Sequence, residues 1–270
     1  RQPIYYKNQN MDEYILKKLK VPHKKSVIKP WVTFTNKLKK CNRKVKIGMI
    51  GKYVDLADSY KSLNESLLHA SVHNNNSLEI DFIDSEDITK KTIKRLNNLQ
   101  GIVVPGGFGN RGVEGKILAA NFARINYIPY FGICLGMQIS VIEFARNILG
   151  LKGANSTEFD LKTPYPVISL VTEWDDYKKG KLKGSLHQMG GTMRLGAQSC
   201  TLMKKTLAYS LYKKNIISER HRHRYEVNNK FVDKFNDTDL IFSGYSGNKN
   251  LTEMLEIKNH PWYLASQFHP

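Results

Sequence analysis

The chain has 270 residues, of which 41% are hydrophobic, so it is long enough for one sizeable core with an appendage. Its most apolar stretch, around residues 128–142, contains Gln138 and is followed by Glu143, so no membrane-spanning helix is expected. The three cysteines, Cys41, Cys134 and Cys200, are odd in number and far apart, which argues against a disulfide framework or a zinc knuckle and predicts a cytoplasmic protein.

The charge is strongly positive, with 42 Lys and Arg against 24 Asp and Glu and a net charge of +18. Most of the excess is lysine spread along the chain, often beside asparagine, and no RNP-like motif, zinc finger or basic helix with interleaved aromatics accompanies it. We therefore interpret the charge as a solvated surface and do not expect nucleic-acid binding. A site for phosphate-bearing ligands is the alternative interpretation.

Residues 1–43 differ from the rest of the chain. They are rich in lysine, carry Pro22 and Pro30, and contain one short amphipathic piece around Tyr14 and Leu19. This pattern predicts a linker with a helix in it, attached to a domain over residues 44–270. Since the first residues form neither a signal peptide nor a start methionine, we expect a fragment of a longer protein.

From Val45 the pattern alternates between strand and helix. Strands are predicted at VKIGMI (45–50), LEIDFI (78–83), GIVVPGG (101–107) and IPYFGIC (128–134). Helices are predicted between them: one capped by Asp58, a polar one through Ile93 and Leu96, one over residues 117–124 and one over residues 136–148. This order predicts an α/β fold with a doubly wound, mostly parallel central sheet flanked by helices.

After Leu151 the predicted strands lie closer together, at VISLV, MRLGA, IISERH, LIFSGY, MLEIK and WYLASQF. Short spacing between strands is typical of antiparallel pairing, so we expect an added, smaller antiparallel layer. In doubly wound sheets, sites collect at the carboxyl ends of the strands. Two such ends carry glycine-rich turns, at residues 105–109 and 132–136.

The turn Gly132-Ile133-Cys134-Leu135-Gly136 has the form G-x-C-x-G. In a strand-to-helix elbow of this form the central residue is strained and exposed at a helix N-terminus, and its flanking positions must be small. The helix dipole there favours a thiolate, and backbone N–H groups point at the atom under attack. Cys134 is therefore a candidate nucleophile; a buried cysteine with glycines for packing is the alternative.

The turn Pro105-Gly106-Gly107-Phe108-Gly109 ends the preceding predicted strand. Its glycines allow close approach to a ligand or exposed N–H groups, although a plain tight turn explains them equally well. A thiol nucleophile also needs a base, and His269 follows the last predicted strand. If residues 219–226 form a strand, Arg220, Arg222 and Arg224 lie on one face of it, which suits carboxylate or phosphate recognition. An exposed, charged edge strand is the alternative, and no metal site is expected because the arginines would repel a cation.

These segments together resemble the triad (class I) glutamine amidotransferases, and among them the amidotransferase domains of the CTP synthase family. The resemblance runs from about Val45 to the last residue, and it is carried by Gly51-Lys52-Tyr53, PGGFGNRGVEG, GICLGMQ, ANSTEF, GGTMRLGAQ, ERHRHRYEVNN and NHPWYLASQFHP. The GGTMRLGAQ and RHRHRYEVN segments narrow the resemblance to the CTP synthase family.

The resemblance implies a glutaminase in which Cys134 attacks L-glutamine and His269 transfers the proton. The oxyanion and the substrate would be held by residues matching family positions: Gly106, Gly107, Leu135, Gln138, Glu158 and Arg224. Phe108 and a lid carrying Arg194 would respond to GTP, the family's activator.

The resemblance also implies partners outside this chain. The ammonia would pass to a synthetase domain that uses ATP, Mg and UTP, while this domain would need no cofactor or metal of its own. Full-length members of the family would be homo-oligomers, expected here as tetramers, without membrane attachment.

One departure concerns the histidine, which the family places in His-x-Glu. The chain stops at Pro270, so the orienting glutamate is expected just beyond it and turnover of this chain is expected to be impaired. Two alternatives stay open at this point: another triad amidotransferase or γ-glutamyl cysteine hydrolase, and a basic, non-catalytic module that binds nucleotide or nucleic acid.

Overall fold

The structure is a computed structural model that describes residues 2–22, 27–52, 59–170, 173–176, 180–183, 193–246 and 251–270. The predicted cap Asp58 and the first three residues of the GGTMRLGAQ segment lie outside the described residues. Within the described residues, no helix is both long and apolar enough to cross a membrane. By their contacts, residues 1–46 and 57–79 form one compact unit, and residues 47–56 and 80–270 form a second.

The first unit is mainly helical and contains the lysine-rich N-terminal residues. Where one amphipathic piece was predicted, the structure has three helices, α1 (Gln2–Asn8), α2 (Met11–Lys18) and α3 (Lys29–Lys40). A fourth, α4 (Lys61–His73), begins three residues after the predicted cap. The interdomain linker role expected for residues 1–43 stays a prediction.

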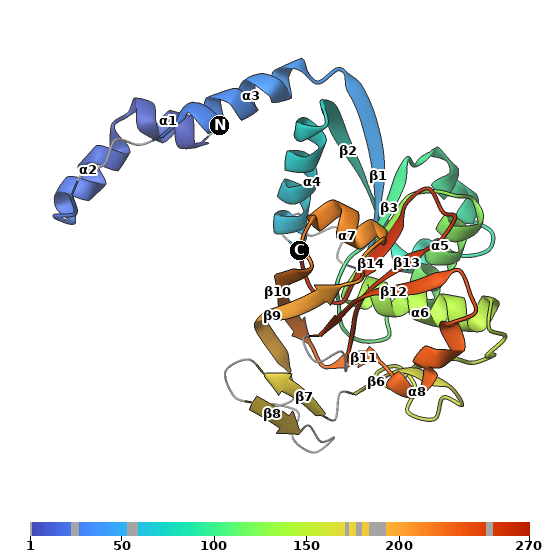
Figure 1. Cartoon of the computed structure of the whole chain (residues 1–270). Coiled ribbons are helices and arrows are strands. Elements are labelled where there is room, and N and C mark those ends of the chain that lie inside the picture. The colour runs from blue at the N-terminus through green and yellow to red at the C-terminus, as the bar shows by residue number, and fades with distance from the viewer. Residues whose placement is uncertain are drawn as a thin grey trace. The chain divides into compact units, whose positions relative to one another are not determined.

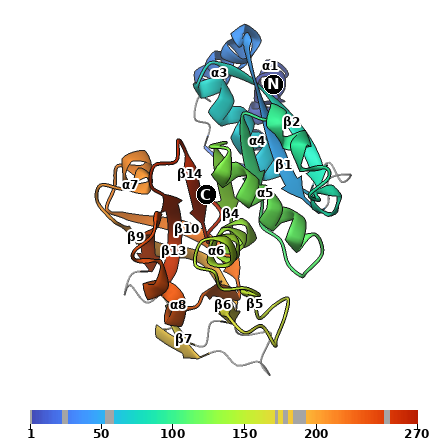
Figure 2. The ribbon, with the colours of Figure 1, turned by 90° about the vertical axis from the view of Figure 1, so that its right-hand side faces the viewer.

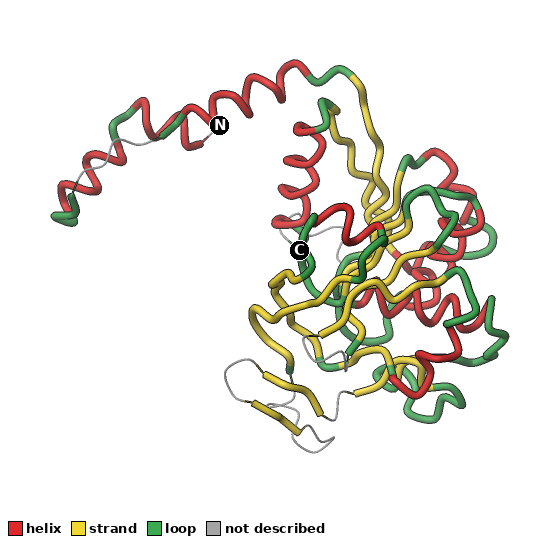
Figure 3. The backbone as a smooth tube through the Cα atoms, viewed as in Figure 1, coloured by secondary structure: helices red, strands yellow, loops and turns green. Residues whose placement is uncertain are grey.

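A nine-stranded sheet, most of which belongs to the second unit, has the strand order β10-β9-β12-β13-β14-β4-β3-β1-β2. Most of its strands are labelled in Figure 1, and strands are yellow in Figure 3. Its first strands in the chain are β1 (Arg43–Gly51), β2 (Asn76–Asp84), β3 (Gly101–Val104) and β4 (Tyr130–Ile133). The later ones are β9 (Arg194–Leu202), β10 (Ile216–His223), β12 (Leu240–Ser246), β13 (Thr252–Ile257) and β14 (Tyr263–Ser266). Strand β1 pairs in parallel with β3, β3 with β4, and β4 with β14.

The antiparallel strands extend this sheet. The pairs β13–β14, β12–β13, β9–β12 and β9–β10 are all antiparallel. Strand β14 therefore joins the two halves of the sheet, although its sequence was grouped with the antiparallel strands. Smaller sheets contain β5 (Asn155–Ser156), β6 (Pro166–Leu170) and β11 (Tyr225–Val227), and the antiparallel pair β7 (Glu173–Asp176) and β8 (Gly180–Lys183). The predicted α/β fold with a small antiparallel sheet is confirmed.

Two helices, α5 (Val113–Ile125) and α6 (Leu135–Asn147), pack side by side against one face of the sheet (Figure 2). Every residue of α6 from Leu135 to Ala145 is buried, as expected for a helix that is covered on all sides. On the opposite face lies α7 (Leu207–Tyr212), which packs on β12 and β13. Successive side chains of β13 alternate between the two cores, with Leu255 on the α6 side and Met254 on the α7 side.

The short elements are η1 (Ser85–Asp87), η2 (Ile93–Asn98), α8 (Asn229–Val232) and η3 (Asp233–Phe235). The polar helix predicted through Ile93 and Leu96 is thus a 3₁₀ segment of six residues. Only Leu96 in it is buried, so one apolar anchor holds the segment and nothing favours a longer α-helix.

Candidate active site

Cys134 occupies the elbow between β4 and α6. Its backbone has φ 53° and ψ −101°, a strained conformation for a residue with a side chain. A Cβ atom on Gly132 would lie 2.6 Å from the carbonyl oxygen of Gly136, and one on Gly136 would lie 2.1 Å from that of Val104. Both glycines are therefore required by close backbone approach, as the G-x-C-x-G pattern predicts.

The thiol of Cys134 is buried, and its environment opposes ionisation. Burial raises its pKa to about 12, while a hydrogen bond from the Leu135 N–H acts in the opposite direction. The Gln267 amide also donates toward the sulfur, with Nε2 3.7 Å from Sγ. The helix terminus therefore supplies the expected donors, but the resting group is a thiol and not the thiolate that the helix dipole alone would favour.

His269 lies across the Gly106 backbone from Cys134. A Cβ atom on Gly106 would be 2.8 Å from His269 Cε1 and 3.5 Å from Cys134 Cβ, so Gly106 lies between the two side chains and any side chain there would displace the imidazole. The His269 N–H donates to the Arg220 carbonyl (2.9 Å), which anchors the segment after β14 to β10. Burial, with the charges of Arg220 and Arg222, lowers the His269 pKa, so the imidazole is neutral at pH 7 and able to accept a proton.

The third member of a triad is not seen beside this histidine. In the part of the chain that the structure describes, no carboxylate forms an ion pair or hydrogen bond with the His269 ring. No group of three or more His, Cys, Asp or Glu side chains among those residues could hold a metal ion.

The Pro105–Gly109 turn borders the thiol from the neighbouring strand β3. A Cβ atom on Gly107 would touch the Leu135 side chain at 3.5 Å, so Gly107 and the start of α6 lie together. Lys52, just after β1, donates to the Phe108 carbonyl, and the Gly109 N–H donates to Glu158 at 2.6 Å. The turn is thus held from two sides, while the Phe108 side chain is half exposed.

The three predicted glutamine-binding residues lie around this turn and α6. Gln138, one turn after Cys134, donates through Nε2 to the Tyr225 carbonyl at 2.7 Å. Burial raises the Glu158 pKa, opposed by the Gly109 N–H and by the positive charges of Lys52 and Arg224. The charge of Arg224 therefore acts on Glu158, and the charge of Glu158 acts in turn on the Cys134 thiol at the elbow.

The structure places Arg194, which the resemblance assigned to a lid, at the start of a strand. It is the first residue of β9, its side chain is 2% exposed, and it contacts Gln198, Glu226 and Glu253. The guanidinium is therefore buried and ion-paired, and the response of Arg194 to GTP stays a prediction.

Two contacting residues, Lys52 and Gln267, were quoted in the segments above without a site role. Gln267 directly follows β14 and lies two positions before His269. Lys52 follows a buried strand at the edge where the glycine-rich turns lie. Position at a strand end is the signal that could have identified both.

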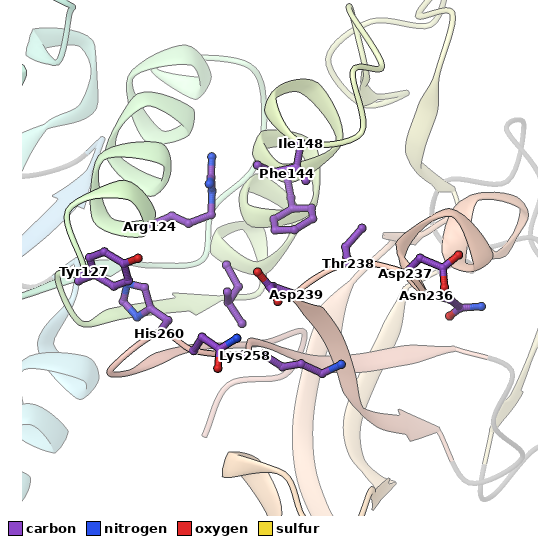
Figure 4. Close-up of a pocket in the computed structure, with 12 residues that line it drawn as sticks. Arg124, Tyr127, Phe144, Ile148, Asn236, Asp237, Thr238, Asp239, Lys258 and His260 are labelled. Atoms are coloured by element: carbon purple, nitrogen blue, oxygen red, sulfur yellow. The ribbon is translucent and has the colours of Figure 1, made fainter.

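A separate pocket of about 600 Å³ lies at the other end of the parallel strands (Figure 4). Tyr127 and His260, which line it, precede β4 and β14, whereas Cys134 and His269 follow these strands. Since active sites of doubly wound sheets form at carboxyl ends, this pocket is not the candidate active site.

A family model described as class-I glutamine amidotransferase matches residues 55–270. The chain therefore belongs to the class I glutamine amidotransferase family. Among solved structures it is similar to the glutaminase domain of CTP synthase from Trypanosoma brucei with bound acivicin. The two are 38% identical, the match covers 84% of this chain and 86% of that chain, and the TM-score is 0.74.

Two more distant structures also match. A glutamine amidotransferase from Thermotoga maritima is 12% identical, with 84% of this chain and 75% of that chain covered and a TM-score of 0.48. A glutamine amidotransferase from Methylobacillus flagellatus is 8% identical, with 84% and 70% covered and a TM-score of 0.48.

Proposed function

We propose that this domain hydrolyses L-glutamine to glutamate and ammonia through a thioester on Cys134. The observation that carries the proposal is the placement of Cys134 at a strained elbow, facing His269 across Gly106, where an added Cβ would press on the imidazole. Membership of the class I amidotransferase family supports the same chemistry.

The first half-reaction joins the sulfur to the side-chain carbon of glutamine. Because the Cys134 pKa is raised and His269 is neutral, the thiol proton moves to His269 as sulfur attacks the amide carbonyl. The N–H groups of Gly107 and Leu135 stabilise the oxyanion that forms. The intermediate collapses when the C–N bond breaks and His269 gives its proton to the departing ammonia.

The second half-reaction returns the enzyme to its starting state. His269 accepts a proton from water, whose oxygen attacks the thioester carbonyl. The C–S bond breaks, glutamate leaves, and the proton passes from His269 to the Cys134 sulfur. Neither half-reaction requires a cofactor or a metal ion.

The two ends of the substrate are assigned by charge. The Glu158 carboxylate would pair with the α-ammonium group, and the Arg224 guanidinium would bind the α-carboxylate. The support for this assignment is that the positive charge of Arg224 acts to lower the pKa of Glu158, which accepts the Gly109 N–H at the Pro105–Gly109 turn. Gln138 fixes the Tyr225 carbonyl next to Arg224.

We further propose that the ammonia serves a CTP synthase reaction. A synthetase domain would use ATP, Mg and UTP to make CTP, GTP would activate the glutaminase half near the exposed ring of Phe108, and the full-length protein would be a cytoplasmic homotetramer. The support is the 38% identity to a CTP synthase glutaminase domain over most of both chains.

Labelling by acivicin, the molecule bound to the Trypanosoma brucei relative, tests the nucleophile. We expect stoichiometric labelling of the chain and glutamine-dependent ammonia release, both lost in Cys134→Ala. Cys200→Ala is the matched control, because Cys200 is equally buried but lies in the core on the α7 side of the sheet. Equal labelling of the Cys134→Ala protein and its parent would refute the assignment.

A further inference from the structure

Behind the candidate active site lies a buried set of charged side chains, the buried brace, made of Arg194, Glu226 and Glu253. Arg194 Nη1 donates to Glu226 Oε1 at 2.6 Å, and its Nη2 lies 2.8 Å from Glu253 Oε1. All three side chains are at most 2% exposed. Gln198 accepts from Arg194 Nε (3.0 Å) and Nη2 (2.6 Å), which fixes the guanidinium plane.

A gain in folding stability does not by itself explain why these three charged side chains are buried together. Desolvation of buried charges offsets much of their attraction, and well-packed apolar residues of similar volume are often as stable. Two carboxylates face one guanidinium here, and burial raises the pKa of Glu226, so the cluster is not optimised as a simple ion pair. The segments that the buried brace connects therefore indicate its role.

The Glu226 end connects to the substrate-binding side. Glu226 lies in β11, directly after Tyr225, whose carbonyl accepts the hydrogen bond from Gln138 at 2.7 Å. Arg224, assigned to the substrate carboxylate, is two residues before Glu226. A displacement of Glu226 therefore moves the backbone that carries Arg224 and holds Gln138.

The Glu253 end connects to the catalytic histidine. The Glu253 carbonyl accepts the Gln267 N–H at 2.8 Å. Gln267 reaches the Cys134 sulfur and also accepts from Gln138 through Oε1 at 3.3 Å. His269 follows two residues later, so Glu253 fixes the segment that ends in the base.

A pair of buried histidines gives a second route to the same segment. His223 Nδ1 lies 3.4 Å from Glu226 Oε1, and its Nε2 is 2.8 Å from His221 Nδ1. The His221 ring packs edge-on against Phe268, the neighbour of His269, with ring centroids 5.7 Å apart.

We infer that Arg194 is a positioning residue for glutamine hydrolysis. By holding Glu226 and Glu253 together, it sets the distance between the substrate-binding strand β11 and the residues 267–269 that carry the base. This inference rests on the proposed function. Since errors of about 1 Å in reacting geometry cost about 100-fold in rate, a loosened brace lowers turnover without removing any group that touches the substrate.

The chain offers a matched control in the Arg124–Glu143 pair. Arg124 donates to Glu143 from both Nε and Nη2, at 3.0 Å and 2.7 Å, and Glu143 is fully buried. This pair joins α5 to α6, and Arg124 lines the pocket at the opposite end of the parallel strands (Figure 4). Arg124→Met removes a comparable buried ion pair far from the elbow.

The test compares Arg194→Met with Arg124→Met for glutamine kcat and KM and for unfolding in urea. We expect Arg194→Met to lower kcat/KM by about 30-fold, through both a lower kcat and a higher KM, because both sides of the site move. Arg124→Met should stay within about threefold of the parent at a comparable loss of stability, and Arg194→Lys should recover part of the activity. Equal proportional losses in the two methionine variants would overturn the inference.

Two further measurements keep the inference testable. If Arg194→Met does not fold, Gln198→Met removes only the acceptor that orients the guanidinium, and we expect a three- to tenfold loss of kcat/KM with folding retained. Alkylation of Cys134 by iodoacetamide, followed by peptide mass spectrometry, needs no glutamine. A parent protein with neither glutaminase activity nor acivicin labelling would refute the proposed function. Equal rates of Cys134 alkylation in the parent and in Arg194→Met would refute the positioning role of Arg194.

Discussion

Substitution of Gly106, which lies between the nucleophile and the base, should change kcat strongly and the free energy of unfolding very little. In Gly106→Ala the new Cβ would lie 2.8 Å from His269 Cε1, which is the far end of a side chain. The imidazole can swing away, and it must move by about 0.6 Å to reach the 3.4 Å of ordinary van der Waals contact. Gly106 has no positive φ, so alanine adds no backbone strain and removes some freedom from the unfolded chain.

The expected result is a loss of about 10- to 100-fold in kcat with the free energy of unfolding changed by less than about 1 kcal/mol. Ammonia release from glutamine and urea denaturation measure the two quantities on the same protein. The matched control is Gly150→Ala. The backbone φ of Gly150 is +69°, and no atom outside the neighbouring residues would lie within 4 Å of the added Cβ. That variant should lose about 1–2 kcal/mol of stability and keep its kcat. A Gly106→Ala protein whose kcat stays within twofold of the parent would refute the placement of His269.

Three further predictions address the substrate, the base and the elbow. Glu158→Gln keeps an acceptor for the Gly109 N–H but removes the charge, so KM for glutamine should rise about 30-fold with a smaller change in kcat; an unchanged KM in steady-state assays would remove Glu158 from the ammonium site. His269 acts as a base only when neutral and its pKa is lowered, so kcat/KM should fall only below pH 6.5; Arg222→Met should raise that pKa and move the acid limb upward, whereas Lys258→Met, at the opposite pocket, should not. Gly136→Ala places a Cβ 2.1 Å from the Val104 carbonyl oxygen, which is backbone, so unfolding in urea should show a loss of about 3 kcal/mol, and a loss below 1 kcal/mol would contradict the packing of the elbow.

The parts of the fold that the sequence predicts are those set by local sterics. The G-x-C-x-G pattern predicts the elbow because two backbone approaches exclude any side chain at Gly132 and Gly136. The glycine-rich turn after β3 and the histidine after β14 lie at strand ends, and adjacent parallel strands bring these ends together.

The rest depends on contacts between residues that are distant in the chain. Arg194 follows a glycine-rich segment and therefore resembles a lid residue, but its partners Glu226 and Glu253 come from other strands and make it a buried residue. The thiol pKa is another example, because the helix terminus favours ionisation while burial, which no local pattern reports, dominates. The place of β14 between parallel and antiparallel neighbours likewise follows from the completed sheet.

A carboxylate for the base can be supplied directly. A protein extended by a glutamate after Pro270 should turn over glutamine faster than the present chain, since an orienting acid holds the imidazole in the productive tautomer. Equal kcat values for the two proteins would show that His269 is already held by its backbone bond to Arg220.

The most direct measurement is of the covalent intermediate itself. The protein is mixed with glutamine and quenched in acid within its first turnovers, and the peptide containing Cys134 is analysed by mass spectrometry. We expect a glutamyl adduct on Cys134 in the parent and in Cys200→Ala, and neither an adduct nor ammonia release in Cys134→Ala. Ammonia release that persists in Cys134→Ala, with no adduct on the parent, would show that Cys134 is not the nucleophile.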